Sequence, residues 1–272
     1  MRNNKSLFVV RWVKKMIKML LYKYNVRVYR SVDEKKILEV IDILKPYHLG
    51  HELIRVGGSG DGGYLIPNLL NQIDFCFSPG VGKISEFELE LKSNGIKSFL
   101  ADYSVEGPAA DNLFNFKKKY IKSFNSDISI TINDWIETSV ENKESNFLMQ
   151  MDIEGSEYEV INSISEKNLK RIKILIIEFH HLEFLTNEVF LETFKSVIKK
   201  LGNYFEVNHI HPNNCCGTSE INNVIFPNVM EVTFLNKEFV KVKEKVNKLP
   251  HKLDVKNVER KKDIILSDYW YS

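Results

Sequence analysis

The chain has 272 residues, 43% of them hydrophobic and 27% charged, so it can bury the core of one large or two small globular domains. This composition excludes a disordered chain and a collagen-like repeat, and charged residues interrupt every hydrophobic run before it reaches the ~20 residues that span a membrane. The net charge of +2 is unevenly distributed, because residues 1–32 hold nine basic and no acidic side chains, whereas the rest hold 29 basic and 36 acidic ones. The acidic body argues against nucleic acid as a partner.

The basic head, residues 1–32, has the spacing of an amphipathic helix, with apolar residues between cations. Arg11 and Lys18 interrupt its apolar stretch in a way that a secretory signal does not tolerate, so we expect a cytoplasmic protein. A basic helix that carries Trp12 can lie on the inner face of an anionic membrane, through residues 1–30. The alternative is packing on its own domain or on a second subunit, which leaves a homo-oligomer open.

The three cysteines, Cys76, Cys215 and Cys216, form an odd count without CxxC spacing. This pattern argues against a disulfide framework and a cysteine-rich zinc site, and it favours a reducing compartment. We expect Cys215 and Cys216 to be packing residues rather than nucleophiles.

A helix is predicted over residues 37–44, and five glycines then fall within residues 57–63. Three of them match G-x-G-x-x-G, but the next residues are Tyr-Leu-Ile-Pro, so no helix begins there and the dinucleotide fingerprint lacks its context. Two interpretations stay open. Asp61 and its neighbouring glycines cover a cofactor or substrate, or they form the turn of a β-hairpin.

The remaining chain alternates short β-branched or aromatic runs with longer amphipathic runs, which predicts an α/β domain with a mostly parallel sheet. We expect strands at residues 73–77, 97–101, 147–151, 172–177, 205–210 and 229–234. We expect helices at residues 85–93, 109–123, 134–141, 156–165 and 188–201. The lysine-rich end keeps scattered apolar residues and should pack back on the domain.

Residues 73–82 read Ile-Asp-Phe-Cys-Phe-Ser-Pro-Gly-Val-Gly, which is a buried strand that runs directly into a glycine turn and then a helical pattern. Such a turn exposes backbone N–H groups at the positive end of a helix, so Gly80, Val81 and Gly82 are predicted to bind a cofactor. Asp102 ends the next apolar run, at a place where an acid can accept hydrogen bonds from ribose hydroxyls. Together these features favour a ligand that contains adenosine.

The segment that begins at Phe147 reads FLMQMDIEGSEYEVI and delivers Asp152 and Glu154 to the carboxyl end of a strand. Ligands of open α/β sheets bind at that edge. The two carboxylates could act as a general base or bind a divalent cation. The alternative is that Glu154 and Ser156 only cap the next helix.

The next strand ends in Glu178, His180 and His181. Because two strand ends converge here, some combination of these groups with Asp152 could deprotonate a hydroxyl. Asp152 and Glu178 are also the ligands expected of a magnesium site. A further polar group follows another apolar run, could line the same cleft and suits hydrogen bonding to a polyol: His209, His211, Asn213 and Asn214.

These segments resemble the FkbM-type family of S-adenosylmethionine-dependent methyltransferases over roughly residues 52–236. The resemblance rests on DGGYLIP, FSPGVGKISEFE, the strand that ends at Asp102, ITINDWI, LMQMDIEGSEYEVI, IIEFHH, the turn after His211, and FPNVMEVTFL. The strand that ends in Asp-Ile-Glu-Gly-Ser-Glu is the most specific element. Ser78 and Pro79 depart from the commoner pattern, in which another glycine or acid stands there.

The resemblance implies a class I methyltransferase-like Rossmann fold, with seven strands in a mostly parallel sheet, an antiparallel last strand and extra N-terminal helices. It implies S-adenosylmethionine at the glycine turn and Asp102, and methyl transfer to an oxygen of a sugar or glycan, in a surface polysaccharide or nucleotide sugar. Glu154, His211, Asn213 and Asn214 are then substrate-binding candidates. The expected division is a helical segment at 1–50, the methyltransferase domain at 51–236 and an extension at 237–272.

Two rival functions stay open. A nicotinamide-dependent oxidoreductase would use the same glycine turn and ribose acid, but Ser85 stands where its third glycine is expected. A non-catalytic module would instead dock on a membrane glycan-assembly complex through the basic head.

Overall fold

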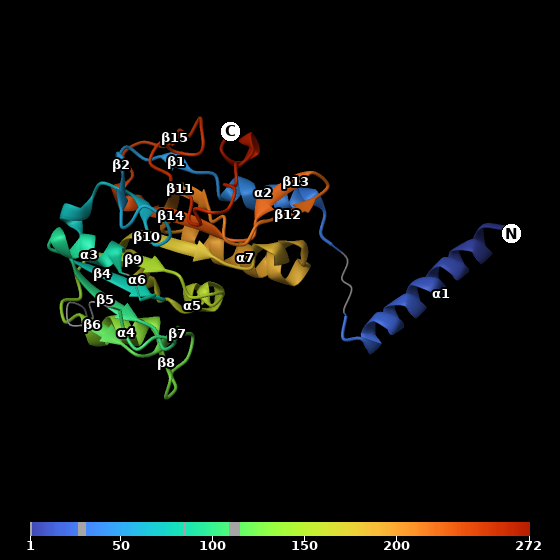
Figure 1. Ribbon diagram of the computed structural model, residues 1–272, viewed down its shortest axis with the longest axis horizontal. Helices are drawn as coiled ribbons and strands as arrows, with labels where there is room; N and C mark the ends of the chain where they lie inside the picture. The colour runs from blue at the N-terminus through green and yellow to red at the C-terminus, as the bar shows by residue number, and fades with distance from the viewer. Residues whose placement is uncertain (1, 27–30, 84, 109–114) are drawn as a thin grey trace.

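The computed structural model describes residues 2–26, 31–83, 85–108 and 115–272, with helices on both sides of a central sheet (Figure 1). The sheet has seven strands in the order β11-β14-β10-β9-β4-β5-β6. In chain order they are β4 (Phe75–Pro79), β5 (Lys97–Ala101), β6 (Asn115–Lys117), β9 (Phe147–Met151), β10 (Ile172–Phe179), β11 (Phe205–Pro212) and β14 (Met230–Asn236). The last strand, β14, is antiparallel to both of its neighbours, whereas the pairs β4–β5, β4–β9, β5–β6 and β9–β10 are parallel. This arrangement confirms the expected mostly parallel sheet.

The helices are α1 (Arg2–Lys23), α2 (Glu34–Ile43), α3 (Glu86–Ser93), α4 (Ile132–Ser139), α5 (Glu157–Ser163), α6 (Glu166–Arg171) and α7 (Glu188–Gly202). Side-chain caps fix several of their starts, since Asp33, Thr131 and Asn187 accept hydrogen bonds from the first-turn amides of α2, α4 and α7. The apolar runs of β9 and β10 are buried throughout. This is the pattern of strands covered on both faces.

The two faces of the sheet carry separate cores. Along β10, Leu175 and Ile177 pack into the larger core with residues of α2, α4, α5 and α7, whereas Ile174 and Ile176 pack into the smaller one under α3. This alternation follows from the two-residue period of a strand. The layers therefore leave only the strand ends open to a ligand, and the parallel strands all place their carboxyl ends at one edge.

Short pairings surround the sheet. They are β1 (Tyr47–His48) with β15 (Glu244–Lys245), β2 (Leu53–Val56) with β3 (Tyr64–Pro67), β7 (Tyr120–Lys122) with β8 (Ser129–Thr131), and β12 (Thr218–Ile221) with β13 (Val224–Pro227). Four short 3-10 helices complete the described elements: η1 (Leu70–Gln72), η3 (Leu182–Thr186), η4 (Lys237–Phe239) and η5 (Asp268–Trp270). The glycine-rich segment 57–63 is the turn of the β2–β3 hairpin, which confirms the hairpin interpretation.

The predicted helix over residues 109–123 is wrong where the structure describes it. Residues 109–114 lie outside the described residues, and the rest of the segment forms β6 and β7. Strand β6 pairs with β5, with Leu100 opposite Phe116. The segment therefore forms a strand at the edge of the sheet although its local sequence has helical spacing, because pairing with β5 outweighs that local preference. The predicted helix 156–165 is divided at Ile164, whose backbone is extended, and α6 follows with Ser165 as its N-cap.

The C-terminal residues lie against the sheet and its hairpins. Trp270 is buried, and the Tyr269 hydroxyl donates to the carbonyl of Ile225 (2.8 Å). The expectation that Cys215 and Cys216 are packing thiols is corrected by the structure, which pairs these adjacent residues as a disulfide. Within the described ranges, none of the helices combines the length and hydrophobicity that a bilayer crossing requires.

Candidate active site

The turn after β4 brings the backbones of two strand ends into contact. Gly80 has a φ of +80°, and a Cβ atom there would lie 1.4 Å from the carbonyl oxygen of Asp152. The Gly80 amide donates to the carbonyl of Ala101 (2.9 Å), and the Asp152 amide donates to the carbonyl of Pro79 (3.1 Å). Only glycine fits this position, so the turn lies tightly between the ends of β4, β5 and β9.

Asp102 follows β5 and faces this turn. Its Oδ2 accepts a hydrogen bond from the amide of Val81 (3.2 Å), and its Oδ1 accepts from both the amide and the hydroxyl of Ser104 (2.6 Å each). The carboxylate is therefore fixed in orientation beside the glycine turn. Its predicted role toward a ribose stays a prediction.

A chain of buried polar side chains lines the inner wall beside the turn. The Ser78 hydroxyl contacts the Glu88 carboxyl group and lies 2.8 Å from Gln150 Oε1, while Gln150 Nε2 donates to the Tyr64 hydroxyl (2.9 Å). Burial raises the pKa of Glu88, which favours its neutral form. Because one hydroxyl donates one proton, Ser78 can donate to only one of these two oxygens.

The sequence analysis did not single out Glu88, Gln150 or Tyr64. The available signal was a polar residue within a strand that is otherwise apolar, as in FLMQM. A buried polar group needs a partner, so such a residue indicates a second polar group at the same depth.

The Asp-Ile-Glu-Gly-Ser-Glu turn places its carboxylates by backbone geometry. Glu154 and Gly155 have φ values of +53° and +97°. Glu157 is fully buried and accepts hydrogen bonds from the amides of Ile153 (3.1 Å) and Gly155 (3.2 Å). Among the described residues Ser156 makes no capping bond, so Glu157 orders this turn instead of Ser156 and Glu154.

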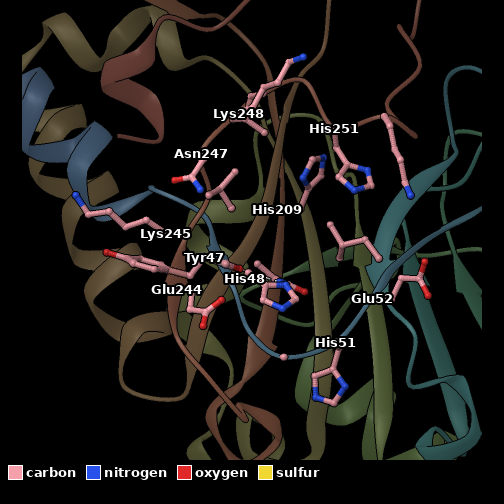
Figure 2. Close-up of a pocket in the computed structure, with 16 residues that line it drawn as sticks. Tyr47, His48, His51, Glu52, His209, Glu244, Lys245, Asn247, Lys248 and His251 are labelled. Carbon is pink, nitrogen blue, oxygen red and sulfur yellow. Dashed lines mark hydrogen bonds between the residues drawn. The ribbon is translucent and has the colours of Figure 1, made fainter.

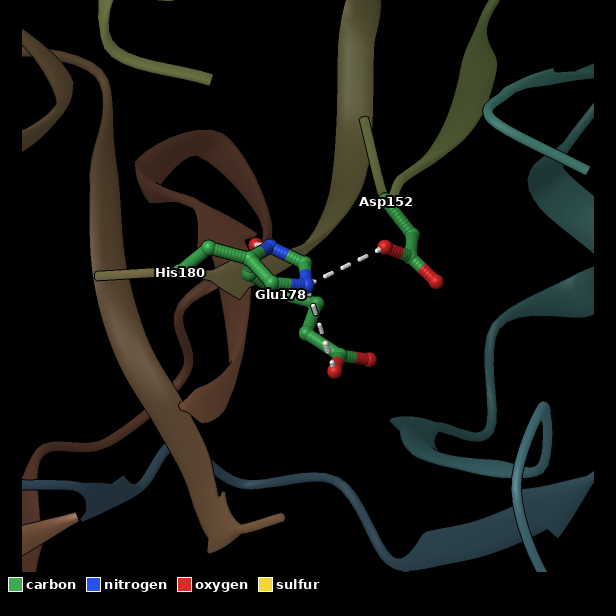
Figure 3. Close-up of side chains that lie close together, drawn as sticks. All are labelled: Asp152, Glu178 and His180. Carbon is green, nitrogen blue, oxygen red and sulfur yellow. Dashed lines mark hydrogen bonds and ion pairs between the residues drawn. The ribbon is translucent and has the colours of Figure 1, made fainter. Parts of the chain in front are cut away.

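His180 follows β10 and lies among four carboxylates, and Figure 3 shows two of them, Asp152 and Glu178. Its Nδ1 is 3.1 Å from Glu157 Oε1, and its Nε2 is 3.7 Å from Asp152, 3.4 Å from Glu154 and 3.8 Å from Glu178. The contact with the Glu157 carboxylate favours a proton on Nδ1. Nε2 then faces the other three carboxylates, as the convergence of the two strand ends predicted for Asp152 and His180.

The pKa values of His180 and Asp152 both lie near neutral pH. Burial lowers the pKa of His180, but the hydrogen bond and charge of Glu157 and the charges of Asp152 and Glu154 outweigh it and raise this pKa to about 8. Burial raises the pKa of Asp152 to about 7, against the attraction of the His180 cation. Groups whose pKa lies near the working pH are the most effective in proton transfer.

A second group of acids adjoins the first through Glu178. Asp61, Glu178 and Glu231 have carboxylate oxygens within 4.8 Å of one another, as have the ligand atoms of Asp152, Glu178 and His180. Burial raises the pKa of Glu178 well above its ordinary value and that of Glu231 to about 8. Both groups have the donors of a divalent cation site.

Amide side chains bind these acids from two other segments. Asn213 donates to Glu178 Oε1 (2.9 Å), and Asn257 donates to Glu231 Oε1 (2.6 Å) and Asp61 Oδ1 (3.2 Å). The sequence analysis missed Glu231 and Asn257. An acid within the apolar run VMEVTFL was a signal for the first, but a lone asparagine in the C-terminal extension gave none.

The glycine turn and Asp152 line one cleft of about 830 Å³, whereas His180 and His181 do not line it. Its lining includes all five predicted cofactor-binding residues, the catalytic candidate Asp152 and the substrate-binding candidate Glu154: Asp61, Gly80, Val81, Gly82, Asp102, Asp152 and Glu154. The hairpin turn therefore lines this cleft as well. The two interpretations of the glycine-rich segment are compatible, and the covering of a cofactor or substrate stays a prediction.

His181 is turned away from this cleft. Its Nδ1 lies 3.6 Å from Glu183, and its ring packs so closely on Gly155 that a Cβ atom there would lie 2.7 Å from it. The structure therefore brings His180, but not His181, to Asp152. The predicted catalytic role of His181 stays untested by this arrangement, although its ring fixes the conformation of the turn.

The residues predicted to bind a polyol lie in different parts of the structure. Asn213 reaches Glu178, but Asn214 donates to the carbonyl of Val258 (3.0 Å) in the C-terminal extension. His211 is buried, and neither of its ring nitrogens has a hydrogen-bond partner among the described residues. Burial lowers the pKa of His211, which favours its neutral form. The residue lies beside Leu249 and Asp254 of the extension.

His209 lines a second cleft, of about 540 Å³, between β1, β11 and the extension (Figure 2). Its Nε2 lies 2.8 Å from Asp254 Oδ1. His48, His51 and His251 also line this cleft. The glycine turn, Asp102 and Asp152 do not line it, so the structure does not place His209 in the cleft that the sequence analysis expected.

The donor set of the main cleft fits S-adenosylmethionine. The backbone of the glycine turn lies beside the Asp102 carboxylate, and both line the cleft. The acids that line the cleft complement a cofactor with a cationic sulfonium and amino group. Gly80, Val81, Gly82 and Asp102 would hold its adenosine part.

Strand order, the antiparallel β14, and a glycine turn and acid at the first two strand ends define a class I methyltransferase-like fold. Residues 81–210 match the family model of the methyltransferase FkbM domain. This segment is therefore an FkbM-type methyltransferase domain, which confirms the resemblance and implies S-adenosylmethionine as the methyl donor. The nicotinamide-dependent alternative loses its support.

Two solved structures are similar at a low level. The fibrillarin pre-rRNA processing protein of Methanococcus jannaschii has 10% identity and a TM-score of 0.37, over 69% of this chain and 83% of its own. A protein of Pyrococcus horikoshii described as a candidate RNA methyltransferase has 11% identity and a TM-score of 0.33, over 75% and 99%. Similarities this low carry no conclusion about this chain. A comparison with curated proteins finds no match.

Proposed function

We propose that the protein transfers a methyl group from S-adenosylmethionine to a hydroxyl oxygen of a sugar or glycan, in a surface polysaccharide or a nucleotide sugar. One observation carries the proposal. A single cleft is lined by the glycine turn, by Asp102 and by Asp152. Donor-binding and proton-accepting groups therefore face the same space, as alignment of donor and acceptor requires.

A hydroxyl acceptor is supported by the carboxylates at the acceptor end. A hydroxyl must lose its proton as the new bond to carbon forms, so its methylation benefits from a general base. Asp152 Oδ1 is buried and has no hydrogen-bond partner among the described residues, so it is free to accept that proton. The positive charge of His180 opposes the rise in the pKa of Asp152 that burial causes, and so favours the ionised carboxylate.

Sugars present several neighbouring hydroxyls, each of which donates a hydrogen bond. The cleft offers matching acceptors, because Asp61 and Glu154 line it beside Asp152. The Glu154 side chain is 86% exposed, which leaves it open to a bound molecule. A polyol therefore fits this edge better than an apolar acceptor.

The reaction divides between cofactor and chain. The cofactor supplies a methyl group on a positively charged sulfur, and this group passes to the acceptor oxygen. Asp152 takes the acceptor proton, and His180 orients Asp152 and stabilises its charged form. Glu157, through Nδ1 of His180 and the amides of the turn, holds both in place.

A divalent cation is the alternative to proton acceptance by Asp152. Asp152 and Glu178 would be its ligands, and the cation would lower the pKa of the acceptor hydroxyl. Its support is the crowding of buried carboxyl groups, whose pKa values rise because burial and their neighbours oppose ionisation. A cation would relieve that opposition. If magnesium is bound, its addition should raise the melting temperature of wild-type protein but not of Glu178→Gln.

The test begins with ligand-induced stabilisation. We expect S-adenosylhomocysteine to raise the melting temperature, and NAD to leave it unchanged. The second step compares the masses of surface glycans from cells with wild-type protein, Asp152→Asn and the exposed control Glu141→Gln. Wild type and control should add one CH2 unit per modified sugar, and Asp152→Asn should not.

Any of three outcomes contradicts this proposal. Stabilisation by NAD alone would favour an oxidoreductase. Full glycan methylation by a folded Asp152→Asn variant would remove Asp152 from the reaction, and methylation that is unaffected by loss of the whole protein would favour a non-catalytic docking module.

A further inference from the structure

Helix α1 is not covered by the rest of its own chain. Every described side chain from residue 10 to residue 26 is exposed, except that of Leu21, which is partly exposed. Trp12 is 56% and Leu20 is 60% exposed. Figure 1 shows α1 projecting away from the domain. Large apolar side chains in this number are costly to leave in water, so the helix requires an external surface.

The described part of α1 has two distinct faces. At 100° per residue, the cations of residues 10–20 occupy an arc of roughly 100° and follow the i, i+3, i+4, i+7 spacing: Arg11, Lys14, Lys15 and Lys18. Lys23 stands outside this range, in the last turn of the helix. The opposite arc, of roughly 180°, is apolar and consists of Val10, Trp12, Val13, Met16, Ile17, Met19 and Leu20. The surface that covers α1 must therefore be apolar where it contacts the apolar arc and negatively charged where it contacts the cations.

We propose that α1 lies in the plane of an anionic phospholipid bilayer, with its apolar arc in the acyl boundary and the cations of the opposite arc among the head groups. Such a bilayer offers both an apolar layer and negative charge. Lysine and arginine at the margins can keep their stems in the apolar layer and their charges in water.

Charge selects this occupant over the α1 helix of a second copy of the chain. Residues 1–32 contain nine basic and no acidic residues, so two α1 helices in contact would bring like charges together without compensation. A spanning orientation is also excluded for α1 by its cations. The inference does not depend on the proposed methyl transfer, because it rests on α1 alone.

Trp12 provides a direct reporter of this contact. The other two tryptophans, Trp135 and Trp270, are 1% and 2% exposed, so an aqueous quencher reaches mainly Trp12. With phosphatidylcholine vesicles that contain phosphatidylglycerol, we expect the full-length protein to co-sediment, its emission to shift to the blue and iodide quenching to fall. With phosphatidylcholine alone, binding should be weak.

Two double variants separate the contributions of the two faces. Lys14→Gln with Lys18→Gln should weaken binding to the anionic vesicles about thirtyfold, at about fivefold for each cation. Ile17→Ser with Leu20→Ser should abolish the blue shift. A matched control, Lys248→Gln with Lys252→Gln, removes the same charge from exposed positions elsewhere and should bind like wild type.

Three results would overturn the inference. One is equal binding to neutral and anionic vesicles, and another is an equal loss of binding in the control. The third is concentration-dependent dimerisation that requires Ile17 and Leu20 without any vesicle binding. Circular dichroism and the melting temperature show that each variant is folded, and S-adenosylhomocysteine binding, measured in parallel, tests the proposed function separately.

Discussion

Gly80→Ala should damage the cofactor cleft far more than a substitution that imposes the same backbone strain elsewhere. Gly80 and Gly95 share a φ of +80°. A Cβ atom at residue 80 would meet the carbonyl oxygen of Asp152 at 1.4 Å, whereas one at residue 95 would meet nothing within 4 Å among the described residues. Gly95→Ala therefore measures the left-handed conformation alone, at about 1–2 kcal/mol.

The additional loss at Gly80 follows from the contact distance. An ordinary contact begins at 3.4 Å, so the two backbones must separate by about 2 Å, which is enough to break the hydrogen bonds that join them. The Gly80 amide would lose Ala101 and the Asp152 amide would lose Pro79. At about 1 kcal/mol for each bond, Gly80→Ala should cost about 2 kcal/mol more than Gly95→Ala.

The assay is urea unfolding of both variants, together with calorimetric titration by S-adenosylhomocysteine. We expect the affinity of Gly80→Ala to fall at least about tenfold, which is 1.4 kcal/mol, and that of Gly95→Ala to stay at the wild-type value. Equal free energies of unfolding for the two variants would refute the packing argument. A wild-type affinity in Gly80→Ala would refute the placement of the cofactor at this turn.

The shifted pKa values of two acids give further predictions. Asp152 acts as a base only when ionised, so wild-type methyl transfer should rise as the pH increases through about 7; a rate that stays flat from pH 6 to pH 8 would contradict its role. Burial raises the pKa of Glu231 to about 8 in the folded state, above its unfolded value, so its contribution to stability is lost as the pH rises through 8. In EDTA, the melting temperature of Glu231→Gln relative to that of wild type should therefore increase from pH 6 to pH 9. If this difference does not increase, a partner compensates the burial of the Glu231 charge.

Much of the fold was accessible from local pattern. The strands β4, β5, β9, β10, β11 and β14 were predicted at nearly their observed positions, because each is a short apolar run bounded by turn residues. Strand β6 was missed because its three residues are specified by pairing with β5 and not by their own sequence. A short edge strand carries little periodicity of its own.

The candidate site shows the same distinction between local sequence and tertiary contacts. Gly80, Asp102, Asp152 and His180 follow strand ends directly, and parallel strands place these ends at one edge. The sequence alone therefore determined that these residues approach one another. Asp152 and His180 meet in the structure as that reasoning predicted.

Only the tertiary structure decided which distant segments complete this edge. Asn257 reaches Glu231 from the C-terminal extension, whereas His211 and Asn214 turn toward that extension and away from the cleft. No periodicity encodes such contacts, because they depend on how a segment without regular structure crosses the finished sheet. Local sequence specifies where a strand ends, and the packing of remote chain specifies what that end faces.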